Sequence, residues 1–206
     1  MMKYKTLNEF KEEPHPWPPF IPTNAGKLIL GTFPTTENNR GAYEFFYPNP
    51  LNDFWKLIFE VAGKDLDEYG ALEPVVIRKQ VLTDLSLGIA DIGKRILRQK
   101  DSSKDENLFP IEFTDIFSLL ENQSSIRKII ITSSSGANSV LSWFQQYCHL
   151  NNTVFHVPKG NLPVKTNFIF NNREIKVDII SSPSRLSPIR GDRLLQMYRD
   201  SILEDC

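Results

Sequence analysis

Two segments far apart in the chain each consist of an apolar strand that stops at a proline-containing loop. The first, Lys27-Leu-Ile-Leu-Gly-Thr-Phe-Pro34, precedes a stretch rich in aromatics and asparagine, Phe45-Phe-Tyr-Pro-Asn-Pro-Leu-Asn-Asp-Phe-Trp55. The second is Val177-Asp-Ile-Ile-Ser-Ser-Pro-Ser-Arg-Leu-Ser-Pro188. In open α/β sheets, ligands bind where strands end and loops begin. We therefore expect both loops to border one cleft that suits a flat ligand with hydrogen-bonding edges, such as a nucleobase.

The alternation of strands and helices predicts an α/β fold, namely a three-layer α/β/α sandwich with a mostly parallel central sheet. Apolar and β-branched runs predict strands at residues 27–30, 127–132, 153–157, 168–170 and 175–180, with a strand or turn at 88–93. Helical spacing predicts helices at residues 54–61, 75–87, 113–120, 137–148 and 194–202. Asn52 or Asp53 is well placed to cap the first helix. Without a repeat or a second domain, residues 1–206 are expected to form a single domain.

Two polar or proline-rich segments are expected to lie outside the sandwich. Residues 11–22 form a Pro-rich arm that should run extended over the surface, because proline lacks the backbone donor that helices and central strands need. Residues 95–107 are expected to form a surface loop. The basic clusters at residues 94–100 and 185–199 either face solvent or contact phosphate.

Composition excludes several classes of site. The net charge of −1 gives no overall argument for nucleic-acid binding. Cys148 and Cys206 do not make a disulfide framework. His15, His149 and His156 show no ligand spacing, so we expect no metal and no cofactor. The absence of a long apolar segment predicts a cytoplasmic protein with no membrane partner.

Two familiar catalytic patterns are incomplete. Residues 131–140 pass from a strand through a Ser/Gly turn into a helix, but no lysine follows Gly136 as in a phosphate-binding loop. The turn can hold one phosphate, or Ser135 can simply cap the helix. Ser182 and Ser184 have no visible base and suit hydrogen bonding better than nucleophilic attack. Leu186 either folds back onto the core or projects as a wedge into a stack of bases.

Taken together, the two loops resemble the uracil-DNA glycosylase superfamily. Its mismatch-type members carry Gly-Ile-Asn-Pro-Gly, Asn-x-Phe-Trp and Asn-Pro-Ser-Gly-Leu-Ser, where this chain has Gly31-Thr-Phe-Pro-Thr35, Asn52-Asp-Phe-Trp55 and Ser182-Pro-Ser-Arg-Leu-Ser187. The hypoxanthine-DNA (deoxyinosine) glycosylase branch is more similar. Its Pro-rich arm, Gly-Ser-Phe-Pro and Tyr-Tyr-x-x-Pro-x-Asn-x-Phe-Trp match the arm, Gly31-Thr-Phe-Pro34 and Phe46-Tyr-Pro-Asn-Pro-Leu-Asn-Asp-Phe-Trp55.

This resemblance implies a monofunctional DNA glycosylase that flips a deaminated base, hypoxanthine or uracil, out of DNA and hydrolyses its N-glycosidic bond. It implies DNA as the partner, with no obligate protein partner, and a catalytic role for Asn52. Asp91 is the expected catalytic proton acceptor, with Glu44 as the alternative. Two further sets of residues follow from the matched motifs. Gly31, Thr32, Phe33, Pro34, Phe46 and Asn49 would bind the base, and Ser182, Pro183, Ser184, Arg185, Leu186 and Ser187 would bind DNA.

One departure from the family pattern bears on activity. Phe33 stands where the mismatch-type enzymes place a catalytic asparagine, and the aspartate of the uracil-specific branch is also missing near it. The alternative function is therefore a catalytically weak or inactive nucleic-acid-binding relative. For the active enzyme, we expect Phe33, Phe46, Asn52 and Ser184 to converge on one pocket of about the size of a base.

Overall fold

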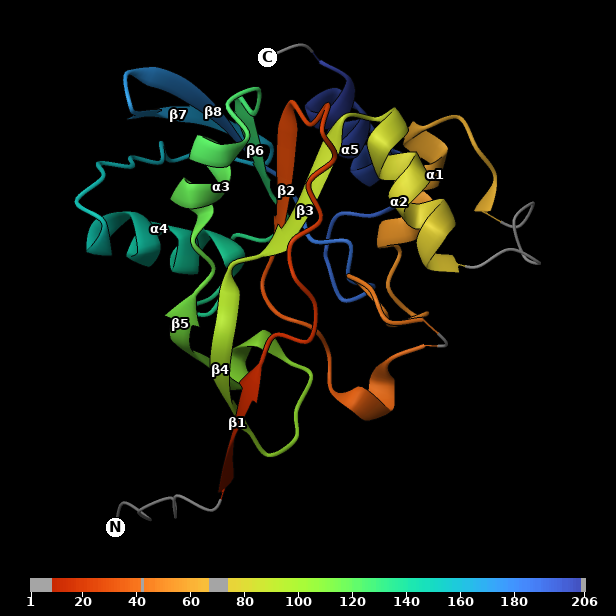
Figure 1. The fold of residues 1–206 in the computed structure, drawn as a ribbon. Helices are drawn as coiled ribbons and strands as arrows, with labels where there is room; N and C mark the ends of the chain where they lie inside the picture. Colours follow the sequence, from red (N-terminus) through yellow and green to blue (C-terminus); the bar gives the residue numbers. More distant parts are fainter. Residues whose placement is uncertain (1–8, 42, 67–73, 205–206) are drawn as a thin grey trace.

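The computed structural model describes residues 9–41, 43–66 and 74–204, so Cys206 lies outside the described residues. Two sheets form the frame of the molecule, one of five strands and one of three (Figure 1). The strands are β1 Phe10–Pro14, β2 Lys27–Gly31, β3 Leu87–Asp91, β4 Gly93–Gln99, β5 Leu108–Phe113, β6 Lys128–Ile131, β7 Val164–Phe170 and β8 Arg173–Ile179. The α-helices are α1 Phe54–Val61, α2 Pro74–Asp84, α3 Ile116–Asn122, α4 Val140–Leu150 and α5 Gly191–Leu203.

The larger sheet has the strand order β3-β2-β6-β8-β7. β3, β2, β6 and β8 are parallel, whereas β7 runs antiparallel to β8. Asn171 and Asn172 join β7 to β8 with φ angles of 49° and 59°, the left-handed conformation that a tight hairpin turn requires. The sheet is therefore mixed, and the prediction of a mostly parallel sheet is wrong, because this hairpin reverses the edge strand and a second sheet is antiparallel.

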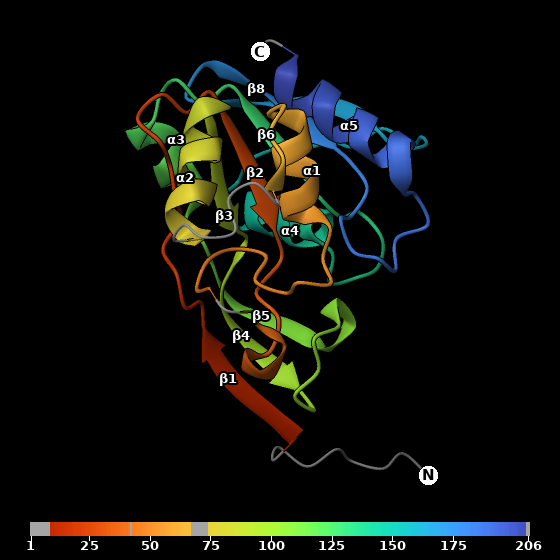
Figure 2. The same cartoon turned by 90° about the vertical axis from the view of Figure 1, so that its right-hand side faces the viewer.

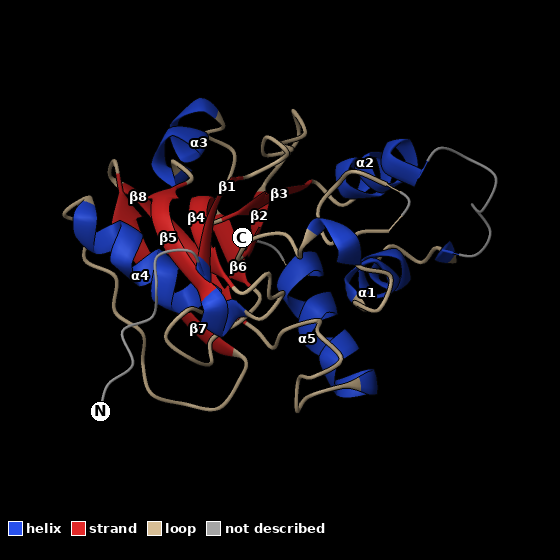
Figure 3. Ribbon diagram, turned by 90° about the horizontal axis from the view of Figure 1, so that it is seen from below, coloured by secondary structure: helices blue, strands red, loops and turns tan. Residues whose placement is uncertain are grey.

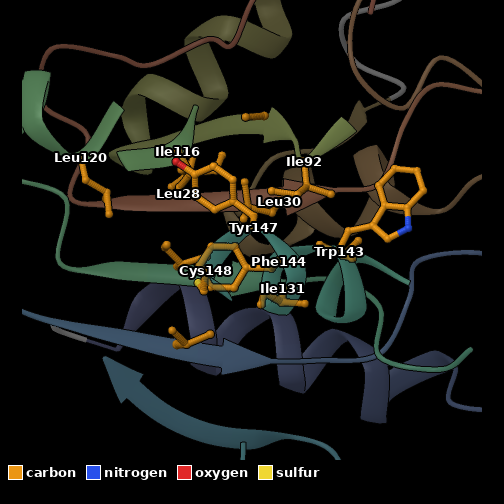
Figure 4. Packing of buried hydrophobic residues seen from close by; sticks show 14 of the residues in the cluster. Leu28, Leu30, Ile92, Ile116, Leu120, Ile131, Trp143, Phe144, Tyr147 and Cys148 are labelled. Atoms are coloured by element: carbon orange, nitrogen blue, oxygen red, sulfur yellow. The ribbon is translucent and has the colours of Figure 1, made fainter. Parts of the chain in front are cut away.

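Helices cover both faces of the larger sheet, as the view along the strands shows (Figure 3). Leu28 and Leu30 of β2 point to the face packed by α3 and α4, where Trp143 and Phe144 belong to the same buried cluster (Figure 4). Ile29 points to the opposite face, which α1, α2 and α5 cover. Strands buried on both faces need apolar residues at every position, and this explains the uninterrupted apolar runs in the sequence.

The smaller sheet, with the order β1-β4-β5, is antiparallel and lies beyond the carboxyl end of β3 (Figure 2). The predicted surface loop at residues 95–107 is wrong, because most of its first half is strand β4. Arg98 is 1% exposed and donates to Glu13 of β1 at 3.0 Å and to the carbonyl of Pro34 at 2.8 Å. A polar sequence thus forms a central strand because its buried charge is paired.

The Pro-rich arm is partly strand. Residues 10–14 form β1 at the edge of the smaller sheet, where proline is tolerated. Further along the arm, Phe20 forms an isolated antiparallel bridge with Ile89 of β3. The arm therefore connects both sheets rather than lying loosely on the surface.

Four other predicted elements differ from the structure. The helix predicted at residues 75–87 ends at Asp84, because Ser86 adopts a φ of 52° and β3 follows. β5 occupies the start of the helix predicted at 113–120, and α3 begins only at Ile116. Residues 153–157 form no strand. Ser139, not Ser135, caps α4 by accepting from the backbone of Ser142 at 3.2 Å.

Within the described part of the chain, none of the helices has the length and apolar character needed to cross a bilayer.

Candidate functional site

A cavity of about 930 Å³ opens at the carboxyl ends of the four parallel strands. Thr32, Phe33 and Pro34 line it after β2, and Asp91 lines it at the end of β3. Residues 132–138 follow β6, and residues 181–189 follow β8, with most of both segments in the cavity wall. This edge of the sheet is where the chemistry of open α/β folds is usually found. We call this cavity the main cavity, residues 32–53 the first loop and residues 181–188 the second loop.

The two loops predicted to border one cleft touch each other. Asn52 and Ser184 form an isolated antiparallel bridge, and the backbone N–H of Asp53 donates to the carbonyl of Pro183 at 3.1 Å. The Nε atom of Arg185 donates to the carboxylate of Asp53 at 3.3 Å. Segments more than 100 residues apart in the sequence are thereby held as neighbouring walls of one site.

Asp91 lies at the buried end of the main cavity. Its Oδ2 atom is 3.0 Å from Nε2 of His15, and because a carboxylate can only accept, Nε2 is the donor. Both side chains are less than a tenth exposed. A Cβ atom on Gly31 would lie 2.1 Å from Oδ1 of Asp91, so only glycine allows the carboxylate to approach β2 this closely. A residue of the arm and a glycine of β2 together set the position of Asp91.

Tyr47 and Thr132 form a second buried hydrogen bond in the wall of the cavity. The ring of Tyr47 stacks on Phe54 with 3.8 Å between centroids, and its hydroxyl lies 3.0 Å from Oγ1 of Thr132. Thr132 donates its single proton to the carbonyl of Leu30, so Tyr47 is the donor to Thr132. Burial raises the pKa of Tyr47 well above its usual value, and the neighbouring Asp91 raises it further. Tyr47 is thus a permanent phenol.

Asn52 lines the main cavity and also begins α1. Its Oδ1 atom accepts from the backbone of Phe54, the first residue of α1, at 2.9 Å, whereas Asp53 occupies the N-cap position without a side-chain cap bond. Within the part of the chain that the structure describes, the carboxamide nitrogen of Asn52 has no hydrogen-bond partner. The side chain is oriented by its oxygen, and its N–H groups remain to donate to a ligand. Asn49 lines the same cavity and accepts from the backbone of Leu51 at 2.9 Å.

The serine hydroxyls of the second loop hold the loop in shape. Ser182 accepts from the backbone of Ser184 at 3.2 Å, and Ser184 accepts from the backbone of Leu186 at 3.3 Å. Ser181 and Ser187 share a buried hydrogen bond of 2.7 Å. The side chain of Leu186 projects from this rigid loop and is 85% exposed. Its exposure rules out the reading in which Leu186 folds back onto the core.

Asp105 also lines the main cavity, although it belongs to the connection between β4 and β5. Asp105 is exposed, and partial desolvation of its carboxyl group by the surrounding atoms raises its pKa to about 6. The hydroxyl of Thr32, 3.4 Å from Oδ2, lowers this pKa, Asp91 raises it, and Arg98 lowers it. The site thus contains two carboxyl groups in different environments.

Several predicted site residues lie elsewhere. Phe46 does not line the main cavity; it is 1% exposed, and its carbonyl accepts from Nε1 of Trp55 at 2.9 Å. Gly31 does not line the main cavity and affects it only through its close contact with Asp91 and Tyr47. Arg185 lines an adjoining cavity of about 730 Å³, which shares Asn49 and Asn52 with the main cavity. We call this second space the side cavity. Phe46 is therefore not available as a stacking surface.

The predicted basic cluster at residues 94–100 is occupied by ion pairs. Lys94 contacts Glu112, and Arg95 contacts both Glu12 and Glu112 at 3.0 Å. Among the residues described, no group of three His, Cys, Asp or Glu side chains could hold a metal ion. This side of the smaller sheet offers no free cluster of cations for phosphate.

Sequence reasoning missed His15, Tyr47, Asp105 and Thr132. His15 belongs to the arm that was expected to run extended over the surface, and Asp105 to the predicted surface loop. Tyr47 directly follows Phe46 in the aromatic stretch, and the sequence does not indicate which of these two side chains faces the cavity. Only the fold of the arm brings His15, and only the connection after β4 brings Asp105, to the ends of the parallel strands.

The chain is similar in sequence to proteins named as DNA glycosylases. Two relatives named hypoxanthine DNA glycosylase come from Methanosarcina barkeri and Methanosarcina acetivorans. The first is 29% identical over 118 residues, which cover 56% of this chain and 67% of the relative. The second is 27% identical over 113 residues, which cover 55% of this chain and 66% of the relative. The alignments thus span about two thirds of each relative's length. No protein-family model matches the chain.

A solved structure has a similar fold. It is a solution NMR structure from Methanosarcina acetivorans, provisionally assigned as a uracil DNA glycosylase. It superposes with a TM-score of 0.58 over 89% of this chain and 94% of the other, at 18% identity. At 18% identity this similarity concerns the fold alone, and the likeness to the hypoxanthine-DNA glycosylase branch rests on the two named relatives. The chain is therefore similar to the uracil-DNA glycosylase superfamily and, among its branches, to the hypoxanthine-DNA glycosylases.

Proposed function

We propose that this protein is a monofunctional DNA glycosylase that flips a deaminated base, hypoxanthine or uracil, into the main cavity and hydrolyses its N-glycosidic bond. The observation that carries the proposal is the meeting of the two loops around a cavity of about 930 Å³ at the carboxyl ends of the parallel strands. Leu186 stands exposed at the rim of this cavity, where a wedge would fill the gap left by a flipped nucleotide.

The chemistry requires donors for the departing base and a group that orients water. As the glycosidic bond breaks, negative charge grows on the base. A preorganised hydrogen-bond donor that meets this charge stabilises the transition state by about 3 kcal/mol. The N–H groups of Asn52 suit this role because its oxygen is already bound to the backbone of Phe54. The carboxylate of Asp91, oriented by His15, suits the acceptor for a proton of the attacking water.

The test uses labelled duplexes with a single hypoxanthine, uracil or mismatched thymine, followed by alkali to cleave abasic sites. We expect scission with hypoxanthine or uracil at an excess of protein over DNA. A second candidate function, DNA binding without catalysis, is favoured by Phe33 at the position of the mismatch-type asparagine. Binding to lesion duplexes without scission of any of them would establish this second candidate and refute the first.

Two variants of Asn52 separate catalysis from helix capping. Asn52→Asp keeps the oxygen that accepts from Phe54 but removes the amide donors, and Asn52→Ala removes both. We expect single-turnover excision to fall about 100-fold in both variants, because each loses a transition-state donor. The melting temperature should fall only in Asn52→Ala, by the loss of a cap worth about 1 kcal/mol. Full activity of Asn52→Asp would show that the carboxamide plays no catalytic part.

A further inference from the structure

Each of the two loops contains a tight turn of the same construction. In the first loop, the backbone N–H of Asn52 donates to the carbonyl of Asn49 at 2.9 Å, which closes a four-residue turn. The backbone N–H of Leu51 donates to Oδ1 of Asn49, also at 2.9 Å, and this side-chain bond locks the turn from inside. Pro50 is the second residue of the turn, where its fixed φ stiffens the backbone further. Leu51 is therefore held as the third residue of a rigid turn.

The turn in the second loop repeats this arrangement with a serine in place of the asparagine. The backbone N–H of Ser187 donates to the carbonyl of Ser184 at 2.9 Å, and the N–H of Leu186 donates to Oγ of Ser184 at 3.3 Å. Leu186 is the third residue of this turn, as Leu51 is of the other. Both side chains are exposed, Leu51 by 62% and Leu186 by 85%. Two rigid turns thus present the same type of side chain at the same position.

The pairing of the two loops places these turns side by side. Asn52 is the last residue of one turn, Ser184 is the first residue of the other, and these two residues form the antiparallel bridge between the loops. Leu51 directly precedes the bridge, and Leu186 lies two residues beyond it. Because the bridge is antiparallel, the position of Leu51 faces that of Arg185, the residue before Leu186. The two exposed leucines therefore lie at adjoining positions of one edge.

The cavities do not account for the exposure of Leu51. Leu186 belongs to the rim of the main cavity, whereas Leu51 lines neither the main cavity nor the side cavity. A single exposed leucine is common on protein surfaces, but two on adjoining turns form an apolar edge beside the site. The guanidinium group of Arg185 lies at this edge, and its exposed ion pair with Asp53 can be exchanged for a phosphate. An apolar edge with a cation at it suits duplex DNA, in which stacked bases lie next to phosphates.

We propose that Leu51 is a second wedge, which enters the base stack of duplex DNA beside Leu186 and unstacks the base pair next to the flipped nucleotide. This inference rests on the base flipping in the proposed function, which assigns a wedge to Leu186 alone. A leucine inserted between base steps unstacks them and kinks the duplex, and the kink lowers the cost of extruding a paired nucleotide. Single-stranded DNA has no such stack to open, so the contribution of Leu51 is confined to duplex substrates.

The experiment measures single-turnover excision of a hypoxanthine or uracil from a duplex and from the same oligonucleotide as a single strand. The proteins are the wild type, Leu51→Ala, Leu51→Met and the control Leu150→Ala. Leu150, the last residue of α4, is 68% exposed and lines neither cavity. We expect Leu51→Ala to be about tenfold slower on the duplex and less than about twofold slower on the single strand. Leu51→Met should regain most of the duplex rate, because methionine also serves as a wedge, and Leu150→Ala should match the wild type.

A second readout does not depend on catalysis. Pyrrolocytosine, a base analogue that fluoresces more strongly when it is unstacked, replaces the cytosine of the base pair next to the lesion. Binding of the wild type should raise its fluorescence, and Leu51→Ala should lose about half of this rise, because only one wedge remains.

The outcomes distinguish the second wedge from the glycosylase function. Equal duplex rates and equal fluorescence in the wild type and Leu51→Ala would overturn the role of Leu51 and leave the glycosylase function intact. An equal loss on duplex and single strand would also overturn it, because a merely structural role does not depend on the stack. If the wild type excised no base but raised the fluorescence, and Leu51→Ala raised it less, the glycosylase function would fail and the wedge would stand. A wild type that neither excised a base nor raised the fluorescence would refute both.

Discussion

At the residue scale, the main cavity depends on close approaches that allow no extra atom. Gly31 lies against the carboxylate of Asp91 and the hydroxyl of Tyr47, with distances of 2.1 and 2.9 Å from a hypothetical Cβ atom. Asp91 in turn accepts from His15, which belongs to the arm. A glycine at the end of β2 therefore has a chemical consequence, because it determines where a carboxylate stands.

The variant Gly31→Ala tests this dependence. The added methyl group must displace the carboxylate of Asp91 and break its contact with His15, so we expect a loss of about 1–3 kcal/mol of stability. Excision should fall at least about tenfold. Thermal melting and the single-turnover rate measure the two effects.

Gly26→Ala is the matched control for Gly31→Ala, since a Cβ atom at Gly26 would meet nothing within 4 Å. It precedes the same strand and should change neither stability nor rate appreciably. Equal behaviour of the two variants would show that the approach of Asp91 to β2 is not required.

At the element scale, a buried ion pair connects β6, β8 and α5. Nζ of Lys128 lies 3.8 Å from Asp178 and donates to the carbonyls of Ser201 at 3.3 Å and Glu204 at 3.1 Å. Lys128 and Asp178 are both almost fully buried. Such a pair contributes little net stability against apolar replacements, but removal of one partner leaves a buried charge.

We expect Lys128→Ala to lower the free energy of unfolding by about 3–5 kcal/mol, measured by chemical denaturation. The double variant Lys128→Met, Asp178→Leu should regain most of this loss, because it removes both charges. Lys165→Ala is the control: its pair with Glu204 is half exposed and should be worth less than about 1 kcal/mol. A double variant as unstable as Lys128→Ala would refute the buried-charge explanation.

At the scale of the whole molecule, binding to DNA must rely on local rather than overall charge. The net charge is −1, and the cations on the smaller sheet are paired. Arg185 stands at the junction of the two loops, 55% exposed, and lines the side cavity with Lys56. Its exposed contact with Asp53 is weak enough to be exchanged for a phosphate.

We expect a shallow salt dependence of DNA affinity, with a slope corresponding to about two or three phosphate contacts. Arg185→Ala should reduce that slope by about one and weaken binding to lesion-free duplexes as well. Lys159→Ala is the control, because Lys159 is exposed and lines neither cavity. Fluorescence anisotropy across a salt series measures the slope, and an unchanged slope in Arg185→Ala would exclude a phosphate contact.

The strands that are buried on both faces, and the loops that follow them, could be predicted from the amino-acid sequence alone. β2, β6 and β8 could be predicted because strands covered on both faces need continuous apolar runs. The convergence of the two loops could be predicted because parallel strands bring their carboxyl ends to one edge. Asn52 was expected as a helix cap with a hydrogen-bonding amide in the aromatic stretch, and its catalytic role was implied by the family resemblance.

The polar residues that the fold brings into strands and into the site depend on contacts between distant segments, so they could not be predicted in this way. β4 was missed because Arg98 is buried through its pairing with Glu13 of β1, a partner 85 residues away. His15 and Asp105 enter the site through the arm and through the connection after β4, and neither position has a local pattern. Burial, pairing and a raised pKa depend on distant atoms, whereas apolar periodicity is local. For this reason the place of the site and Asp91 could be predicted from the sequence, whereas His15 and Asp105 beside it were found only in the structure.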